Sequence, residues 1–193
     1  MVQPIEFASE ENLSHQLGVN VLGPIWLIQA FLPALRSARG RIVNVTSGVT
    51  KVTQPFTGLY AASKAALDQI SMSLRLELAP SGVAVILVDP GLMRTRMTEP
   101  GDQTNDAGMA DWTDEALERY GDANRANAAR ISASVPRAKP PEAVAELVVQ
   151  AVEAENHRDQ YLAGSDARAA DLLNRVLSWR VKQALIDRVV FRV

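Results

Sequence analysis

A run of six apolar residues at positions 83–88 (VAVILV) constrains the fold of this chain more than any other feature of its sequence. An uninterrupted apolar run of this length is typical of a strand in a parallel sheet, where helices cover both faces. Asp89, Pro90 and Gly91 follow it directly. Ligands of such sheets bind beyond the carboxyl ends of the strands. The sequence therefore predicts an α/β fold with a binding site beside Pro90 and Gly91.

A second strand is predicted at 42–45, where the residues are mostly β-branched. Turn residues occupy 48–58, and apolar residues at helical spacing begin after Leu59 and continue to about Ala79. Ser47 is therefore expected just past the end of a strand. Tyr60 and Lys64 are expected one turn apart on one face of a helix.

These three residues suggest proton-transfer chemistry. A free phenol is a poor proton donor or acceptor at neutral pH, but an ammonium held beside it favours the phenolate. Lys64 would in this way make Tyr60 a general acid and base, and the Ser47 hydroxyl would hydrogen-bond the substrate oxygen. Each residue alone has a simpler interpretation: a solvated helix face for the Tyr–Lys pair and a helix cap for the serine. The combination of these three residues with Asn20 upstream and a Pro-Gly pair downstream favours a catalytic role over these simpler interpretations.

The helix that carries Asn20 is predicted to begin after Ser9, a plausible N-cap followed by two glutamates. Its apolar face needs to be covered and consists of Leu13, Leu17, Val21, Ile25, Ile28, Phe31 and Leu35. Pro24 lies inside this helix and cannot donate to the carbonyl four residues back, which is that of Asn20. The Asn20 carbonyl is thus expected to be free, or the helix to be kinked there.

Three further elements are predicted in the C-terminal part. A helix starts at Pro140-Pro141, with a buried stripe of Val144, Leu147, Val148, Ala151 and Val152. A short strand follows at 160–163, and one amphipathic helix runs from Asp166 to the end of the chain. This basic, apolar tail is expected to pack on the fold or roof an apolar pocket, with peripheral membrane contact as the alternative.

Composition excludes several functions. The 193 residues, 47% of them apolar, suit one domain (1–193), and the net charge of −2 gives no reason to expect a nucleic acid partner. Cysteine is absent, and His15 and His157 are too isolated to suggest a metal site. No apolar run approaches the ~20 residues that span a bilayer, and no targeting segment is recognisable at the N-terminus. A cytoplasmic protein is expected.

Four short sequence motifs together resemble those of the short-chain dehydrogenase/reductase family: VNVLGP, RIVNVTS, YAASKAAL and VDPGLMRT. The resemblance covers roughly residues 3–165, the C-terminal two-thirds of such an enzyme. It matches Asn20, Ser47, Tyr60 and Lys64 to the family's catalytic tetrad. It implies a partial Rossmann-like, doubly wound parallel sheet and an NAD(P)-dependent oxidoreductase that interconverts an alcohol and a ketone or aldehyde.

The same resemblance implies roles for individual residues. NAD or NADP would be bound by Tyr60 and Lys64, by the main chain at Pro90, Gly91 and Met93, and by the hydroxyl of Thr95. Lys64 would hold the nicotinamide ribose. The main-chain carbonyl of Asn20 would hold a water that links the lysine to solvent.

The resemblance also implies partners and substrates. Residues 92–136 would form a lid over the substrate, with Met97, Gly101, Gly108, Met109 and Trp112 as apolar lining or as packing residues. The tail (166–193) resembles branches that act on hydroxysteroids, retinoids or other lipid-like alcohols. The helices of Asn20 and Tyr60 would form the interface of a homodimer or homotetramer.

No glycine-rich turn of the G-x-G-x-x-G type occurs in the sequence, although the family carries one near its start. The expected fold therefore lacks the strand, turn and helix that hold the pyrophosphate and distinguish NAD from NADP. Two interpretations follow: an oxidoreductase, or a truncated, non-catalytic remnant or interaction protein that binds cofactor poorly. The missing segment is expected to be either a real truncation or the result of a mis-called start.

Overall fold

The computed structural model describes residues 2–52, 54–95, 98 and 109–190. Its order of elements alternates helices with three strands in the manner of an α/β fold. The elements are η1 (Ile5–Phe7), α1 (Glu10–Leu17), η2 (Gly18–Leu22), α2 (Gly23–Ala38), β1 (Arg41–Val45), η3 (Gly48–Thr50), α3 (Gly58–Leu78), η4 (Ala79–Ser81), β2 (Ala84–Pro90), α4 (Asp114–Ser134), η7 (Val135–Arg137), α5 (Glu142–Glu153), β3 (Gln160–Ala163), α6 (Ser165–Val176) and α7 (Trp179–Val190).

The three strands form a parallel sheet, as predicted, and their order in it is β1-β2-β3. The apolar run becomes the central strand β2, paired with β1 from Arg41↔Ala84 onward and with β3 from Leu87↔Gln160 onward. Within the described residues, β1 and β3 are both edge strands. The carboxyl ends of β1 and β2 lie side by side, which brings Ser47 close to Pro90 and Gly91.

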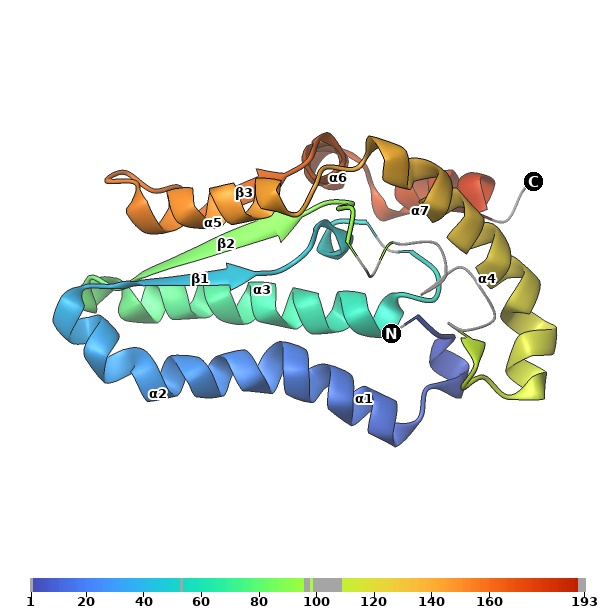
Figure 1. The fold of residues 1–193 in the computed structure, drawn as a ribbon, viewed down its shortest axis with the longest axis horizontal. Helices are drawn as coiled ribbons and strands as arrows, with labels where there is room; N and C mark the ends of the chain where they lie inside the picture. Colours follow the sequence, from blue (N-terminus) through green and yellow to red (C-terminus); the bar gives the residue numbers. More distant parts are fainter. Residues whose placement is uncertain (1, 53, 96–97, 99–108, 191–193) are drawn as a thin grey trace.

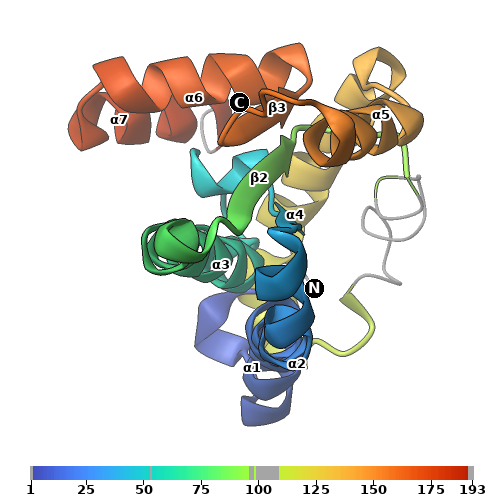
Figure 2. The same ribbon diagram turned by 90° about the vertical axis from the view of Figure 1, so that its left-hand side faces the viewer.

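Helices cover both faces of the sheet (Figure 1). On one face, α3 lies against the strands and α1 and α2 run beneath it; on the other lies α5, and the view turned by 90° shows the same layers end on (Figure 2). A separate apolar cluster fills each face. One joins Ile28, Ile42, Leu78, Val83 and Val85. The other joins Ile86, Val88, Ala151 and Tyr161.

Near Pro24, where a free Asn20 carbonyl or a kink was predicted, the helix changes type. Residues Gly18–Leu22 form a π-helical turn between α1 and α2, with the Gly23 amide donating to the Gly18 carbonyl, and Pro24 then lies in the first turn of α2. Proline lacks the amide proton that an uninterrupted α-helix would need there. π-helical segments are rare and occur mostly as single turns inside α-helices, as here. The predicted N-cap is confirmed, because the Ser9 side chain accepts a hydrogen bond from the Asn12 amide.

Two predictions about the C-terminal part are wrong. The single helix expected from Asp166 is two helices, α6 and α7, separated at Leu177 and Ser178, where the backbone of Leu177 is extended. Val152, expected on the buried stripe of α5, is 52% exposed, because Ala151 faces the sheet instead. The four-residue spacing from Val148 predicted that Val152 would lie on the same buried face. However, α5 ends at Glu153, and little of the sheet remains to be covered there.

One continuous helical stretch, Glu10–Ala38, is long and apolar enough to cross a membrane by length and composition alone. This differs from the sequence-based expectation, which considered only uninterrupted apolar runs. Core helices of soluble proteins pass the same test, and here only a small share of the most apolar window is buried within the chain.

Candidate active site

Ser47, Tyr60 and Lys64 line one pocket of about 940 Å³. The pocket opens beyond the carboxyl ends of β1 and β2, where Pro90 and Gly91 form part of its wall. The side chains predicted from the sequence to act together thus meet in a shared cavity. Met93 and Thr95, the other two residues predicted to bind cofactor, also line it.

Ser47 is held by the turn that follows β1. Its hydroxyl accepts a hydrogen bond from the Val49 amide at 3.3 Å, which caps η3, and its carbonyl accepts from the Thr50 hydroxyl at 3.0 Å. Gly48 is buried in this turn, against the Pro90 carbonyl and Ala167. The serine hydroxyl keeps its own proton for donation to a ligand, because it serves the turn as an acceptor.

Tyr60 and Lys64 lie on the first turns of α3. The Lys64 ammonium donates to the Val45 carbonyl at 3.0 Å, which links the helix to the end of β1. Burial lowers the pKa of Lys64 below its usual 10.5, while the nearby Asp68 carboxylate opposes that shift. A lysine with a lowered pKa gives up its proton more readily than one in water, and this is a property of lysines that take part in proton transfer.

Asn20 does not line the pocket. Its amide donates to the Ser63 hydroxyl at 3.0 Å, and Ser63 in turn donates to the Tyr60 carbonyl at 2.8 Å. Asn20 therefore reaches the helix of Tyr60 from the π-helical turn through one intervening side chain. π turns inside helices are frequent at functional sites.

The remaining wall of the pocket is largely apolar and comes from three later helices. Ile131 of α4, Val144 and Val148 of α5, and Ala167 and Ala170 of α6 line it. Of the lid residues predicted from the sequence, Met97, Gly101 and Gly108 lie outside the described residues. Met109 is buried and Trp112 packs on the ring of Phe56; neither lines the pocket.

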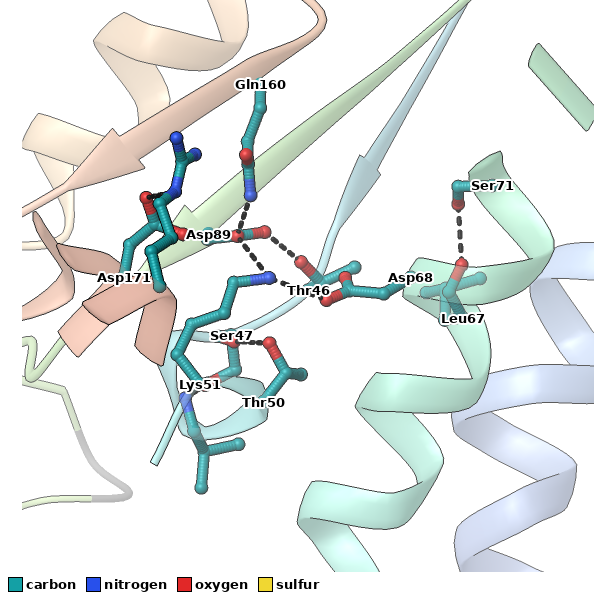
Figure 3. A network of polar contacts seen from close by, with 12 residues as sticks. Thr46, Ser47, Thr50, Lys51, Leu67, Asp68, Ser71, Asp89, Gln160 and Asp171 are labelled. Atoms are coloured by element: carbon teal, nitrogen blue, oxygen red, sulfur yellow. Dashed lines mark hydrogen bonds and ion pairs between the residues drawn. The ribbon is translucent and has the colours of Figure 1, made fainter. Parts of the chain in front are cut away.

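Four charged residues at this end of the sheet were not predicted from the sequence. Asp166 accepts a hydrogen bond from the Leu92 amide at 2.5 Å and lines the pocket. Lys51, Asp68 and Asp89 form a buried network behind the Ser47 turn (Figure 3). The available signal was Asp89, a charged residue directly after the apolar run 83–88. Its partners come from distant segments, and no sequence pattern linked them to it.

Comparison with known proteins adds relatives to this geometry. Residues 1–106 match the sequence family described as short chain dehydrogenase. The chain is 32% identical over its whole length to retinol dehydrogenase 5 of Mus musculus and covers 62% of it. It is 33% identical to the uncharacterized oxidoreductase YbbO of Escherichia coli (strain K12), with 97% of this chain and 63% of that protein covered.

Solved structures agree with these sequence matches. A short chain dehydrogenase from Burkholderia cenocepacia J2315, in complex with NADP, superposes with a TM-score of 0.69 at 26% identity, over 98% of this chain and 64% of that one. A short-chain dehydrogenase from Streptomyces avermitilis shares the fold, with a TM-score of 0.70 at 24% identity. The chain thus spans less than two-thirds of the length of these relatives.

Proposed function

The chain belongs to the short-chain dehydrogenase family, and from this premise we propose that it interconverts an alcohol and a ketone or aldehyde with NAD or NADP. The single observation that carries the proposal is that Ser47, Tyr60 and Lys64 line one pocket beyond the carboxyl ends of two parallel strands. A hydroxyl, a phenol and an ammonium in one largely apolar cavity suit proton transfer to a carbonyl oxygen.

The pocket fits the nicotinamide end of such a cofactor. Its wall offers the Lys64 ammonium, the Tyr60 phenol, the Thr95 hydroxyl and the main chain at Pro90, Gly91 and Met93. These groups would hold the nicotinamide and its ribose, and the bound cofactor would supply or accept the hydride. The lining residues named here concern the nicotinamide end of the dinucleotide.

Each residue of the chain has a distinct task in this proposal. Tyr60 gives a proton to the substrate oxygen in reduction and takes it back in oxidation. Ser47 donates a hydrogen bond to the same oxygen and so fixes its position. Lys64 stabilises the ionised phenol. The main-chain carbonyl of Asn20, whose side chain is anchored to the Tyr60 helix through Ser63, would hold a water that links the lysine to solvent.

The substrate we propose is a lipid-like alcohol or its carbonyl counterpart, such as a retinoid or a hydroxysteroid. Support comes from the valine, isoleucine and alanine side chains that α4, α5 and α6 contribute to the pocket. Similarity to retinol dehydrogenase 5 over the whole chain points the same way. We also propose that the chain forms a homodimer or homotetramer through the faces of α1, α2 and α3.

The test is a fluorescence titration of the 193-residue chain with NADH and NADPH, followed by turnover assays with retinol and androsterone. Tyr60→Phe is expected to lower turnover by at least roughly 100-fold, because the phenyl ring has no proton to transfer. Its cofactor affinity is expected to stay close to that of the unmodified chain, since the ring itself remains.

Tyr120→Phe is the matched control. Tyr120 donates to Glu6 at 2.7 Å and does not line the pocket, so the loss of its hydroxyl is expected to leave turnover unchanged. Absence of saturable cofactor binding at millimolar concentration would instead favour a non-catalytic interaction protein.

A further inference from the structure

Lys51 is the side chain that joins the Ser47 turn to two other elements of the pocket. It follows η3 directly, and its amide donates to the Gly48 carbonyl at 3.0 Å, so it is part of the same tight turn as Ser47. Its ammonium lies 3.1 Å from Asp68 Oδ2, on α3, and 3.4 Å from Asp89 Oδ2, at the end of β2. Figure 3 shows the ammonium between the two carboxylates.

The three charges are largely removed from solvent. The side chains of Lys51, Asp68 and Asp89 are 15%, 9% and 0% exposed. Exposed ion pairs contribute little, but removing one partner from a buried pair leaves an uncompensated charge in a medium of low dielectric constant. Asp68 depends on Lys51 in particular, because its second oxygen, Oδ1, is buried without a hydrogen-bond partner among the described residues.

Asp89 is fixed independently of Lys51. The Thr46 hydroxyl donates to one of its oxygens, and the Gln160 amide donates to the other at 2.6 Å. These contacts connect the carboxyl ends of β1 and β2 with the first residue of β3. Lys51 therefore binds to an anchor that is already rigid, and its contact with Asp68 extends that anchor to the helix of Tyr60 and Lys64.

Within the described part of the chain, the other hydrogen bonds of residues 47–51 remain inside the turn. The polar link between this turn and the rest of the pocket is thus the Lys51 side chain. Burial raises the pKa of the Asp89 carboxyl, and the hydrogen bonds from Thr46 and Gln160 and the attraction of Lys51 oppose that shift only in part. Burial alone would lower the pKa of Lys51, but the carboxylates of Asp89 and Asp68 outweigh it and raise the pKa above its usual value.

We propose that Lys51 is a positioning residue: its ammonium ties the Ser47 turn to the helix of Tyr60 and Lys64 and to the end of β2. This inference rests on the proposed function, because it assigns Lys51 the task of holding the serine hydroxyl at the right place for the reaction. Lys51 itself does not touch the substrate; it acts through the backbone of the turn.

The experiment compares Lys51→Met, Lys51→Arg and the double variant Lys51→Met/Asp68→Asn, with Lys182→Met as the control. Lys182 is a lysine of α7 whose ammonium donates to Asn174, outside the pocket. The readouts are kcat and KM for retinol oxidation, and amide hydrogen exchange of Val49, Thr50 and Lys51 in the 193-residue chain.

Lys51→Met is expected to lower kcat by roughly 10- to 100-fold with little change in KM, because a misplaced hydroxyl affects the transition state more than substrate binding. Lys51→Arg, which can still reach both carboxylates, is expected to recover most of the loss. The double variant removes the uncompensated charge of Asp68 and is expected to regain stability but not kcat. Exchange of the three amides is expected to accelerate in both variants that lack the ammonium.

Unchanged kcat in Lys51→Met, or recovery of kcat in the double variant, would overturn the proposal, since the lysine would then serve only stability. If the unmodified chain neither binds cofactor nor turns over retinol, the proposed function fails. In that case amide hydrogen exchange still tests whether Lys51 holds the Ser47 turn in place. Unchanged protection of the turn amides in Lys51→Met would refute that role.

Discussion

Two lysines face Asp68, and their surroundings affect them in opposite directions. Lys51 is held between Asp68 and Asp89, and the attraction of both carboxylates raises its pKa despite burial. Lys64 lies one turn before Asp68 on α3, and burial lowers its pKa because Asp68 compensates only in part. Lys64, which the proposed chemistry uses, is thus the lysine whose charged form is less stabilised.

The two lysines are therefore expected to titrate in a defined order. In a carbon NMR titration of the lysine side chains, Lys64 loses its proton below the usual 10.5 and Lys51 above it. Lys51 contributes stability that is fully present below 10.5 and is lost as the pH rises through its higher folded value. Lys64 has the opposite sign: its charged form costs stability at neutral pH, and this cost disappears as the pH rises toward 10.5.

Lys51→Met provides the check on this assignment. With Lys51 removed, Asp68 acts on Lys64 alone, and the midpoint of Lys64 is expected to move to higher pH. Identical midpoints for the two lysines, or no response of Lys64 to the substitution, would contradict the picture of one carboxylate shared by two ammonium groups.

At the scale of the elements, the junction between β2, β3 and α6 leaves no space for a side chain at two of its positions. Gly91 follows β2, Gly164 follows β3 with φ of +111°, and the Asp166 carboxylate fills the space that a side chain on either glycine would occupy. The two glycines thus have different reasons to be glycine. At Gly91 the obstacle is Asp166, whereas at Gly164 it is both Asp166 and the backbone conformation.

Alanine substitutions can separate these reasons. Gly91→Ala and Gly164→Ala are each expected to lower the free energy of unfolding by about 1–3 kcal/mol. Adding Asp166→Ala is expected to relieve most of the cost at Gly91, because the obstructing carboxylate is gone, and little of it at Gly164, where the positive φ persists. Urea denaturation measures both.

Gly18→Ala is a suitable control, since nothing lies within 4 Å of a side chain added there. The substitution is expected to be neutral or slightly stabilising, because alanine favours helical conformations over glycine. Equal recovery of Gly91→Ala and Gly164→Ala by Asp166→Ala would show that backbone strain plays no part at this junction.

At the scale of the whole molecule, the helical stretch Glu10–Ala38 leaves large apolar side chains in contact with solvent. Trp26, Leu27 and Phe31 are 61%, 63% and 62% exposed. Large apolar side chains exposed on one helix often mark an interaction site, so we expect a second copy of the chain to cover them.

Sedimentation velocity tests this expectation. The double variant Leu27→Glu/Phe31→Glu is expected to weaken self-association by at least roughly 100-fold, given about 1.5–3 kcal/mol for each buried side chain. Leu172→Glu, a change at an exposed leucine of α6, is the control and is expected to leave association unchanged. A chain that is monomeric before substitution would contradict the proposed interface.

Local pattern was sufficient to predict most of the elements, whereas Met93 and Thr95 of the pocket were predicted only through the family resemblance. The run at 83–88, the Ser9 cap and the spacing of Tyr60 and Lys64 each depend on neighbours in sequence, and each was found where expected. The tie of Lys51 to Asp68 and Asp89 was not predictable, because its partners come from different elements. The break at Leu177 was missed because a continuous amphipathic pattern does not reveal where its backbone becomes extended.

The outer edge of β1 has one further consequence. Along Arg41–Val45 the strand pairs with β2 on one side, and on the other side no strand of the described chain joins it. Extension of the sheet at this edge would leave β2, β3 and the Lys51 tie undisturbed. We therefore expect this edge to accept an added peptide strand of extended conformation through backbone pairing.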